Sequence, residues 1–123
     1  MTTWFHFTCE HSAPSIDASG VLRPTPQKML GDLPMVWLTP LRSARPAWVG
    51  MDQERQHLVT CDRMAHVFQV IEEDAHLVAW WGDLKRDARF EQLLPAARRL
   101  DAYRGARPGA WGVSSHDLRV IRA

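Results

Sequence analysis

The sequence places a histidine and a threonine two residues apart near its start, in the segment TWFHFT at residues 3–8. Polar and apolar residues alternate in this segment and aromatic residues are frequent, which predicts a half-buried β-strand. Side chains two residues apart point to the same face of a strand, so we expect His6 and Thr8 side by side. Because imidazole and hydroxyl groups both donate and accept hydrogen bonds, this pair could bind the polar groups of a ligand in a cleft.

The residues after this pair indicate how it is positioned. Residues 9–19 favour a short helix, since Pro14 is tolerated in a first turn and Gly20 can end the helix in a left-handed conformation. Val21 and Leu22 are expected to be extended, and the proline-rich residues 23–34 to form a loop. The segment MVWLT at residues 35–39 then predicts a central strand bounded by two prolines.

This order of motifs resembles the opening of the ADP-ribosyltransferase superfamily, which includes rifampicin-modifying enzymes and DNA-modifying toxins. The residues that carry the resemblance are His6-Phe7-Thr8, the turn Gly20-Val21-Leu22-Arg23-Pro24 and the strand Val36-Trp37-Leu38-Thr39. The resemblance implies that NAD is the substrate and that it lies in a cleft between two small sheets. It also implies transfer of ADP-ribose to an acceptor, which could be a nucleic acid, a protein or a small molecule.

The resemblance further implies roles for individual residues. His6 would hydrogen-bond the nicotinamide ribose and Trp37 would stack on the nicotinamide ring. The full set of expected NAD-binding residues is His6, Phe7, Thr8, Trp37, Thr39 and Trp48.

A carboxylate is the expected third catalytic group, beside His6 and Trp37, because cleavage of the glycosidic bond passes through a cationic transition state. Members of the superfamily that transfer ADP-ribose usually carry this acid after the third major strand. Asp83 is the preferred residue, since it follows a strand predicted at residues 77–81 and a glycine. The alternatives are Glu72, Glu73 and Asp74.

The order of short strands and helices predicts an α+β fold, and the resemblance implies two small, mostly antiparallel sheets with a cleft between them and two to three short helices. We expect one domain over residues 1–123. Helices are predicted at residues 41–49, with an interruption at Pro46, and at residues 88–103 despite Pro95. Further strands are predicted at residues 57–61, 66–71, 110–114 and 118–121, of which the last two resemble a closing hairpin.

Two other functions remain open at this point. An RNA 2′-phosphotransferase would use the same scaffold and grip a phosphate with arginines, in which case Arg23, Arg42 and Arg63 matter more than Asp83. A non-catalytic module would use the tryptophan-lined groove to bind a nucleotide or a protein. The absence of a distinct motif around the acid favours this module.

Composition excludes several other classes of function. Fifteen Lys and Arg residues against fourteen Asp and Glu give a net charge of +1, so no overall field selects a polyanionic or membrane partner. The apolar runs are too short for a membrane span, and two cysteines without a signal segment predict a cytoplasmic protein.

Histidine and cysteine lack the paired spacing of zinc sites, so no metal is expected. A Cys9 nucleophile with His11 or His6 as base is a weaker alternative.

Overall fold

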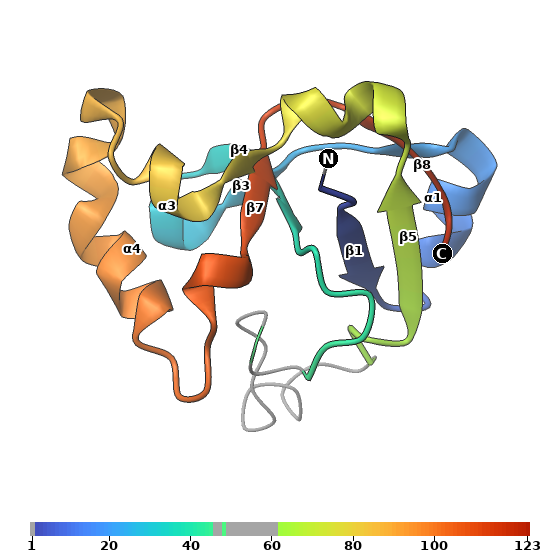
Figure 1. The fold of residues 1–123 in the computed structure, drawn as a ribbon, viewed down its shortest axis with the longest axis horizontal. Helices are drawn as coiled ribbons and strands as arrows, with labels where there is room; N and C mark the ends of the chain where they lie inside the picture. Colours follow the sequence, from blue (N-terminus) through green and yellow to red (C-terminus); the bar gives the residue numbers. More distant parts are fainter. Residues whose placement is uncertain (1, 46–47, 49–61) are drawn as a thin grey trace.

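Two four-stranded antiparallel sheets form the framework of the computed structural model (Figure 1). The structure describes residues 2–45, 48 and 62–123. The expected α+β class with two small antiparallel sheets is confirmed. The expected strand at residues 57–61 lies outside the described residues, as does most of the second half of the helix expected at residues 41–49. Residues 41–45 contain no regular helix.

The first sheet has the strand order β1-β5-β8-β2. Its strands are β1 (Phe5–Thr8), β5 (His66–Val70), β8 (Leu118–Arg122) and β2 (Val21–Leu22). The helix α1 (Ala13–Ser19) precedes β2 and ends at Gly20, whose φ of 68° is the left-handed conformation that glycine adopts without a steric penalty. The sequence therefore predicted both this helix and its end.

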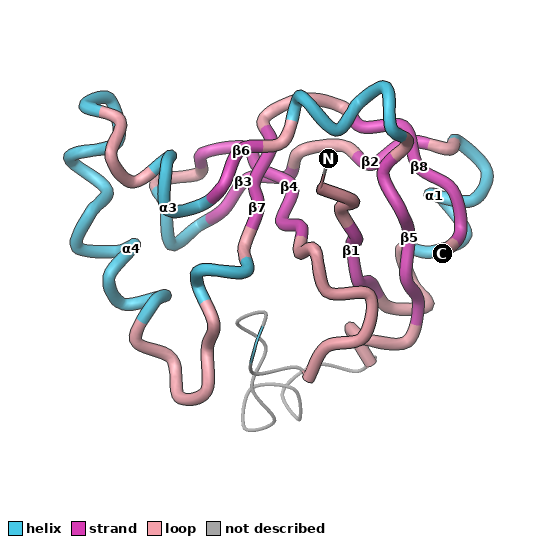
Figure 2. Tube along the Cα trace, viewed as in Figure 1, coloured by secondary structure: helices cyan, strands magenta, loops and turns pink. Residues whose placement is uncertain are grey.

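The second sheet has the order β3-β4-β7-β6. Its strands are β3 (Thr25–Gln27), β4 (Leu33–Leu38), β7 (Gly112–Ser114) and β6 (Ala79–Trp80). The helices α3 (Trp81–Leu84) and α4 (Leu94–Asp101) lie on the side of this sheet away from β1 and β5, as the tube in Figure 2 also shows. Short 3₁₀ helices connect the elements: η1 (Lys28–Leu30), η3 (Glu72–Leu77), η4 (Ala88–Leu93) and η5 (Pro108–Ala110).

Strand β4 contributes to both hydrophobic cores because its side chains alternate between its two faces. Val36 and Leu38 pack into the core under the first sheet, together with Trp4 and Phe68. Met35 packs into the other core, which contains buried tryptophans and the apolar face of α4. A backbone bridge joins the two sheets, where Phe5 at the start of β1 pairs with Thr39 just beyond β4.

The prediction of a loop at residues 23–34 is wrong, because β3 and the first part of β4 form a hairpin there. Pro26 and Pro34 are paired directly opposite each other in this hairpin. Neither proline can donate a hydrogen bond, but β3 is an edge strand and β7 pairs only with residues 36–38 of β4. Both prolines thus occupy positions where no neighbouring strand requires a backbone donor, which is the exception that allows proline in a sheet.

The single helix expected at residues 88–103 is also wrong, since the chain forms η4 and then α4. The change falls at Pro95, which lacks the N–H that would continue the first helix and instead occupies the first turn of α4. The strand expected at residues 77–81 is shortened to β6 for a different reason. There, Trp81 begins helix α3, and its ring is fully buried in the second core.

The closing strands β7 and β8 do not form the expected hairpin. β7 pairs with β4 and β6 in the second sheet, whereas β8 pairs with β5 and β2 in the first. The turn at residues 115–117 therefore carries the chain from one sheet to the other. This crossing, together with the Phe5–Thr39 bridge, fixes the position of one sheet against the other.

Candidate functional site

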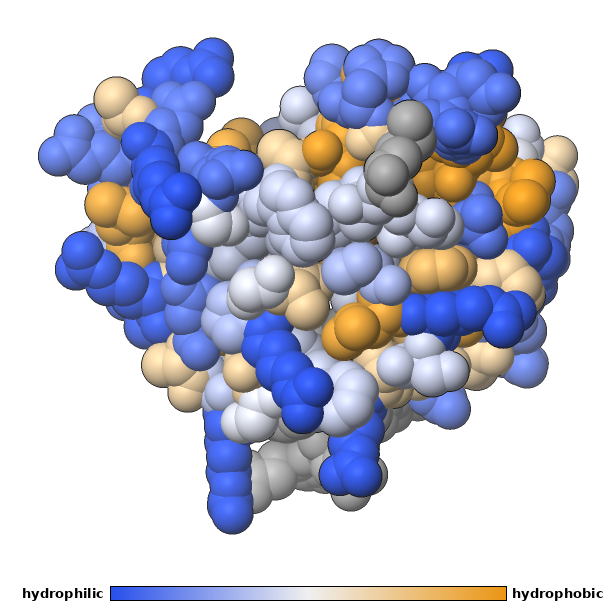
Figure 3. All heavy atoms as spheres, in the orientation of Figure 1, coloured by the Kyte–Doolittle hydropathy of each residue, from blue (hydrophilic) through white to orange (hydrophobic). Residues whose placement is uncertain are grey.

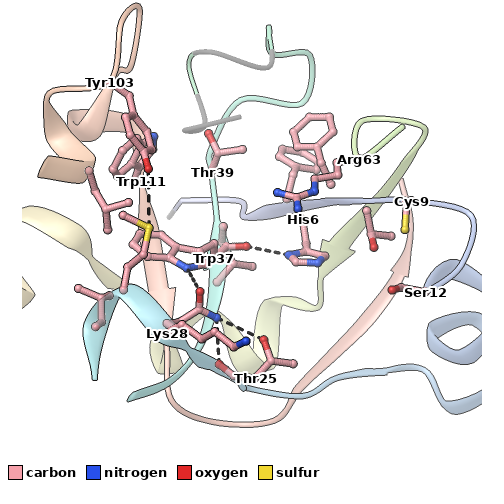
Figure 4. Close-up of a pocket in the computed structure, with 18 residues that line it drawn as sticks. His6, Cys9, Ser12, Thr25, Lys28, Trp37, Thr39, Arg63, Tyr103 and Trp111 are labelled. Atoms are coloured by element: carbon pink, nitrogen blue, oxygen red, sulfur yellow. Dashed lines mark hydrogen bonds between the residues drawn. The ribbon is translucent and has the colours of Figure 1, made fainter. Parts of the chain in front are cut away.

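A cleft of about 510 Å³ opens between the two sheets, beside the bridge from Phe5 to Thr39. Figure 4 shows that His6 and Arg63 lie on one side of the cleft, Tyr103 and Trp111 on the other, and Trp37 between them. The cleft has the size of ordinary small-molecule sites, and most of its lining is apolar. Of the residues predicted to bind NAD, the following line it: His6, Phe7, Thr8, Trp37 and Thr39.

His6 projects from β1 and its ring is fixed by one short hydrogen bond. Its Nδ1 lies 2.7 Å from the backbone oxygen of Trp37 (Figure 4). A carbonyl oxygen only accepts hydrogen bonds, so Nδ1 carries the proton and Nε2 of the neutral ring is an acceptor. Burial lowers the pKa of His6 below its ordinary value of 6.5, against the smaller opposing effect of the bond to Trp37. The site thus holds a neutral imidazole with a defined acceptor atom.

Trp37 is half-buried, and its indole is held on several sides. The ring centroid lies 5.0 Å from that of Trp81 and 5.8 Å from that of Trp111, both in the second core. Its Nε1 donates to Oε1 of Gln27 at 3.1 Å. Because the ring lines the cleft as well as the core, it can offer an aromatic surface to a ligand.

Gln27 is a site residue that the sequence did not indicate. Its Nε2 donates to the backbone oxygens of Thr25 at 2.9 Å and Met35 at 3.3 Å, which leaves Oε1 directed toward the indole of Trp37. The residue lies at the end of β3, within the segment predicted as a loop. Nothing in the sequence distinguishes it from the other polar residues of that segment.

The two threonines differ in what their hydroxyl groups do. Thr39 is buried, and its Oγ1 accepts a hydrogen bond from the backbone N–H of Leu41, so it shapes the chain after β4. Thr8 is also buried at the end of β1 and lines the cleft next to His6. The expected placement of Thr8 beside His6 is therefore seen in the structure.

A second hollow, called here the side recess, continues from the cleft toward α1 and has a volume of about 620 Å³. It shares a wall with the cleft, because His6, Thr8, Gln27 and Trp37 line both. Its far side lies along α1 and β2 and combines polar residues with the apolar Ile16, Val21 and Leu22. The polar residues of this side include His11, Ser15, Ser19 and Arg23.

Two residues expected at the site lie elsewhere. Asp83 is in α3, where its side chain is 65% exposed and forms an ion pair of 3.4 Å with Arg86. It lines neither the cleft nor the recess. Trp48 does not line the cleft either, although its backbone oxygen accepts a hydrogen bond from Nε1 of Trp111 at 2.7 Å.

The alternative acids do not reach the cleft. Asp74 is buried and accepts hydrogen bonds from the backbone N–H of Arg119 at 2.8 Å and from its Nη2 at 2.7 Å. These bonds lower the pKa of Asp74 and tie η3 to β8. Glu72 and Glu73 are exposed on η3. Within residues 2–45, 48 and 62–123, no carboxylate lines the cleft or the side recess.

The charged groups that do line the two hollows are cationic. Lys28 and Arg63 line the cleft, and Arg23 lines the side recess. An anionic ligand is therefore favoured over a cationic one. Among the described residues, no group of three or more His, Cys, Asp and Glu side chains is arranged to hold a metal ion. The helices in this part of the chain are all too short or too polar to cross a membrane.

These observations define the site as a neutral imidazole and an indole that face a common cleft, with cations at its edges. Comparison of the chain with protein-family models, with curated proteins and with solved structures finds no match.

Proposed function

We propose that the cleft and the side recess together bind NAD, and that the protein transfers the ADP-ribose group to an acceptor. The observation that carries this proposal is the position of His6 beside Trp37. Nε2 of His6 is an acceptor suited to a ribose hydroxyl, and the Trp37 ring offers a face for nicotinamide. The two hollows meet at these residues, so a ligand with two rings can place one in each.

The cations in the two hollows are suited to bind the diphosphate that joins the two halves of NAD. Arg23 lies in the side recess, while Lys28 and Arg63 lie in the cleft. Arginine binds phosphate oxygens through two parallel N–H groups, which also orients the ligand. The neutral state of His6 is consistent with this role, because a protonated imidazole would lose the acceptor at Nε2.

The transfer step breaks the bond between the ribose and the nicotinamide nitrogen. Nicotinamide leaves as a neutral molecule with the electron pair of that bond, and a nucleophilic oxygen or nitrogen of the acceptor bonds to the ribose carbon. The proton of the acceptor is released to water. The protein would contribute mainly by holding the ribose and the ring in position, which can supply a large part of a rate enhancement.

Release of nicotinamide from NAD, followed by chromatography, tests the proposal. We expect the wild-type protein to release nicotinamide and to show quenching of tryptophan fluorescence by NAD. His6→Ala should lose turnover by at least about tenfold, in line with the loss of one positioned hydrogen bond. Arg86→Ala is the matched control, because Arg86 is exposed on the far side of the second sheet. Absence of both quenching and release in the wild-type protein would refute the proposal.

A non-catalytic NAD- or nucleotide-binding module is the second candidate. It is favoured by the fact that no described carboxylate lines the cleft. In this case NAD quenches the fluorescence of the wild-type protein, and no nicotinamide is released at any concentration of protein.

A phosphotransferase that acts on an RNA 2′-phosphate is favoured by Arg63 in the cleft, although Arg42 lies in an exposed loop and lines neither hollow. Loss of that phosphate from an oligonucleotide in the presence of NAD would identify this activity.

A further inference from the structure

Asp101 is the last residue of α4, and its carboxylate contacts two side chains of the neighbouring helix α3 region. Oδ1 accepts a hydrogen bond from Nε1 of Trp81 at 2.7 Å, and Oδ2 accepts one from the ammonium group of Lys85. Trp81 is the first residue of α3, and Lys85 directly follows that helix. Asp101 therefore ties the end of α4 to both ends of α3.

The ion pair of Asp101 and Lys85 lies between the solvent and the second core. Most of the surface over α3 and α4, at the left of Figure 3, is hydrophilic, and the side chains of the pair are each 24% exposed. The ring of Trp81 is fully buried, and Nζ of Lys85 lies 5.7 Å from its centroid. A buried indole N–H requires an acceptor, because burial without one loses the hydrogen bond that water would provide. Asp101 supplies this acceptor.

The ring of Trp81 packs against the two tryptophans that line the cleft. Its centroid lies 5.0 Å from that of Trp37 and 6.4 Å from that of Trp111, and the centroids of Trp37 and Trp111 are 5.8 Å apart. Trp81 itself does not line the cleft. Because a close-packed interior leaves no room for one ring to move alone, a rotation of Trp81 would displace its neighbours. The orientation of Trp37 thus depends on how Trp81 is held.

Asp101 also lies next to the residues that form one side of the cleft. Leu100 precedes it, Tyr103 follows two residues later, and both line the cleft. Tyr103 lies on the opposite side of the cleft from His6 (Figure 4). A movement of the end of α4 would therefore change the distance between the two sides of the cleft. The same carboxylate that holds Trp81 in the core thus also holds this side in position.

We propose that Asp101 is a positioning residue for the cleft, and that its hydrogen bond to Trp81 holds the indole of Trp37 in place for a ligand. Asp101 lines neither the cleft nor the side recess, so it acts through the ring of Trp81 and not by touching the ligand. Gln27 differs from it, because Gln27 accepts a hydrogen bond from Trp37 directly. The effect on the indole is independent of the ligand, whereas the expected effect on NAD binding rests on the proposed function.

Three variants separate the hydrogen bond to Trp81 from the ion pair with Lys85. Asp101→Leu removes both. Asp101→Asn keeps an oxygen acceptor for the indole but loses the negative charge, and Lys85→Met removes the ion pair from the other side. The indole N–H resonance of Trp37 in a nitrogen–proton spectrum, assigned with Trp37→Phe, reports the effect. We expect it to shift in Asp101→Leu and to stay near its wild-type position in Asp101→Asn and Lys85→Met.

Titration with NAD, followed by tryptophan fluorescence, measures the consequence for binding. The affinity should fall by about threefold to tenfold in Asp101→Leu, the range expected for the loss of one hydrogen bond. It should change by less than about twofold in Asp101→Asn and Lys85→Met, which lose only a partly exposed ion pair. Val70→Ala is the control for reduced stability, because Val70 is buried in the first core and lines neither hollow. It should unfold at a lower urea concentration and bind NAD like the wild-type protein.

If Asp101→Leu does not fold, Asp101→Ser takes its place, because its hydroxyl lies one bond nearer the backbone than Oδ1 and does not reach Trp81. A Trp37 resonance that stays in place in this variant, or that shifts equally in Lys85→Met, would overturn the proposal. Equal losses of NAD affinity in Val70→Ala and in the Asp101 variant would leave Asp101 with a structural role alone. If the wild-type protein does not bind NAD, the proposed function fails, and the Trp37 resonance still decides whether Asp101 holds the indole.

Discussion

At the scale of single residues, the site depends on the hydrogen bond between His6 and the backbone of Trp37. This bond joins a side chain of the first sheet to the backbone of the second. It fixes the ring orientation and leaves Nε2 as the acceptor. The sequence predicted that His6 and Trp37 would face one cleft, but it contained no information on this bond, which depends on how the two sheets meet.

The lowered pKa of His6 has a consequence for stability. The unfolded chain binds the proton more readily than the folded protein, so the free energy of unfolding should decrease as the pH falls below about 6.5 and stop decreasing below the folded-state pKa. His6→Gln removes the titrating group while keeping a side-chain donor for the oxygen of Trp37. Urea unfolding at about pH 7.5 and about pH 5 should therefore show a larger loss for the wild-type protein than for His6→Gln. Equal losses would contradict burial of a neutral His6.

Gln27 should control the orientation of the Trp37 indole. Gln27→Met removes the acceptor for Trp37 Nε1 and should cost about 0.5–1.5 kcal/mol of stability, the usual net value of one hydrogen bond. Gln27→Glu keeps an acceptor for the indole but loses the donors to Thr25 and Met35.

The indole N–H resonance of Trp37 in a nitrogen–proton spectrum reports the bond directly, and Trp37→Phe assigns it. We expect this resonance to shift in Gln27→Met much more than in Gln27→Glu. NAD affinity should fall in the same order if the indole stacks on the ligand. An unshifted resonance in Gln27→Met would show that Gln27 does not hold the ring.

At the scale of elements, local signals predicted those segments whose structure depends on neighbouring residues. Gly20 ended α1 as expected, and alternation identified β1, β5 and β8. The predictions failed where pairing or packing with a segment distant in the sequence decides the structure. Pro34 indicated the end of a strand. In the structure β3 pairs with the segment around Pro34, at a position where no neighbouring strand requires a backbone N–H. Asp83 was expected at the cleft because it follows a strand, yet Trp81 is buried and starts a helix that directs Asp83 outward.

The position of Gly112 in β7 requires a residue without a side chain, which the sequence did not reveal. A Cβ atom at this position would overlap the ring of Trp4, with only 2.8 Å to its Cε3 atom. Trp4 is 3% exposed and packs in the first core, so it cannot move without disturbing that core. We expect Gly112→Ala to lower the free energy of unfolding by about 1–3 kcal/mol through overpacking.

Gly109→Ala is the matched control for this substitution, because no atom lies within 4 Å of its Cβ position. Its effect should stay within about 0.5 kcal/mol, as for most surface changes. Both values come from urea unfolding curves, with thermal unfolding as an independent check. Similar stabilities for the two variants would contradict the close packing of Trp4 on β7.

At the scale of the whole molecule, the cleft exists because two separate cores share the strand β4. The α+β class was predictable from the order of short strands and helices, whereas the arrangement of two sheets around a cleft was expected from the resemblance to ADP-ribosyltransferases. The assignment of β7 and β8 to different sheets was not, because both strands have similar local patterns. The net charge of +1 likewise gives no indication that Lys28 and Arg63 line the cleft.

NAD is proposed to bind between His6 and Trp37, and a nuclear magnetic resonance titration of the labelled protein with NAD reports on both side chains at once. We expect progressive, saturable shifts of the Trp37 indole N–H and of the His6 ring signals. The indole signal of Trp80, which packs on Trp4 and does not line the cleft, should remain in place. Unchanged Trp37 and His6 signals at high concentrations of NAD, or shifts confined to Trp80, would show that NAD does not bind in the cleft.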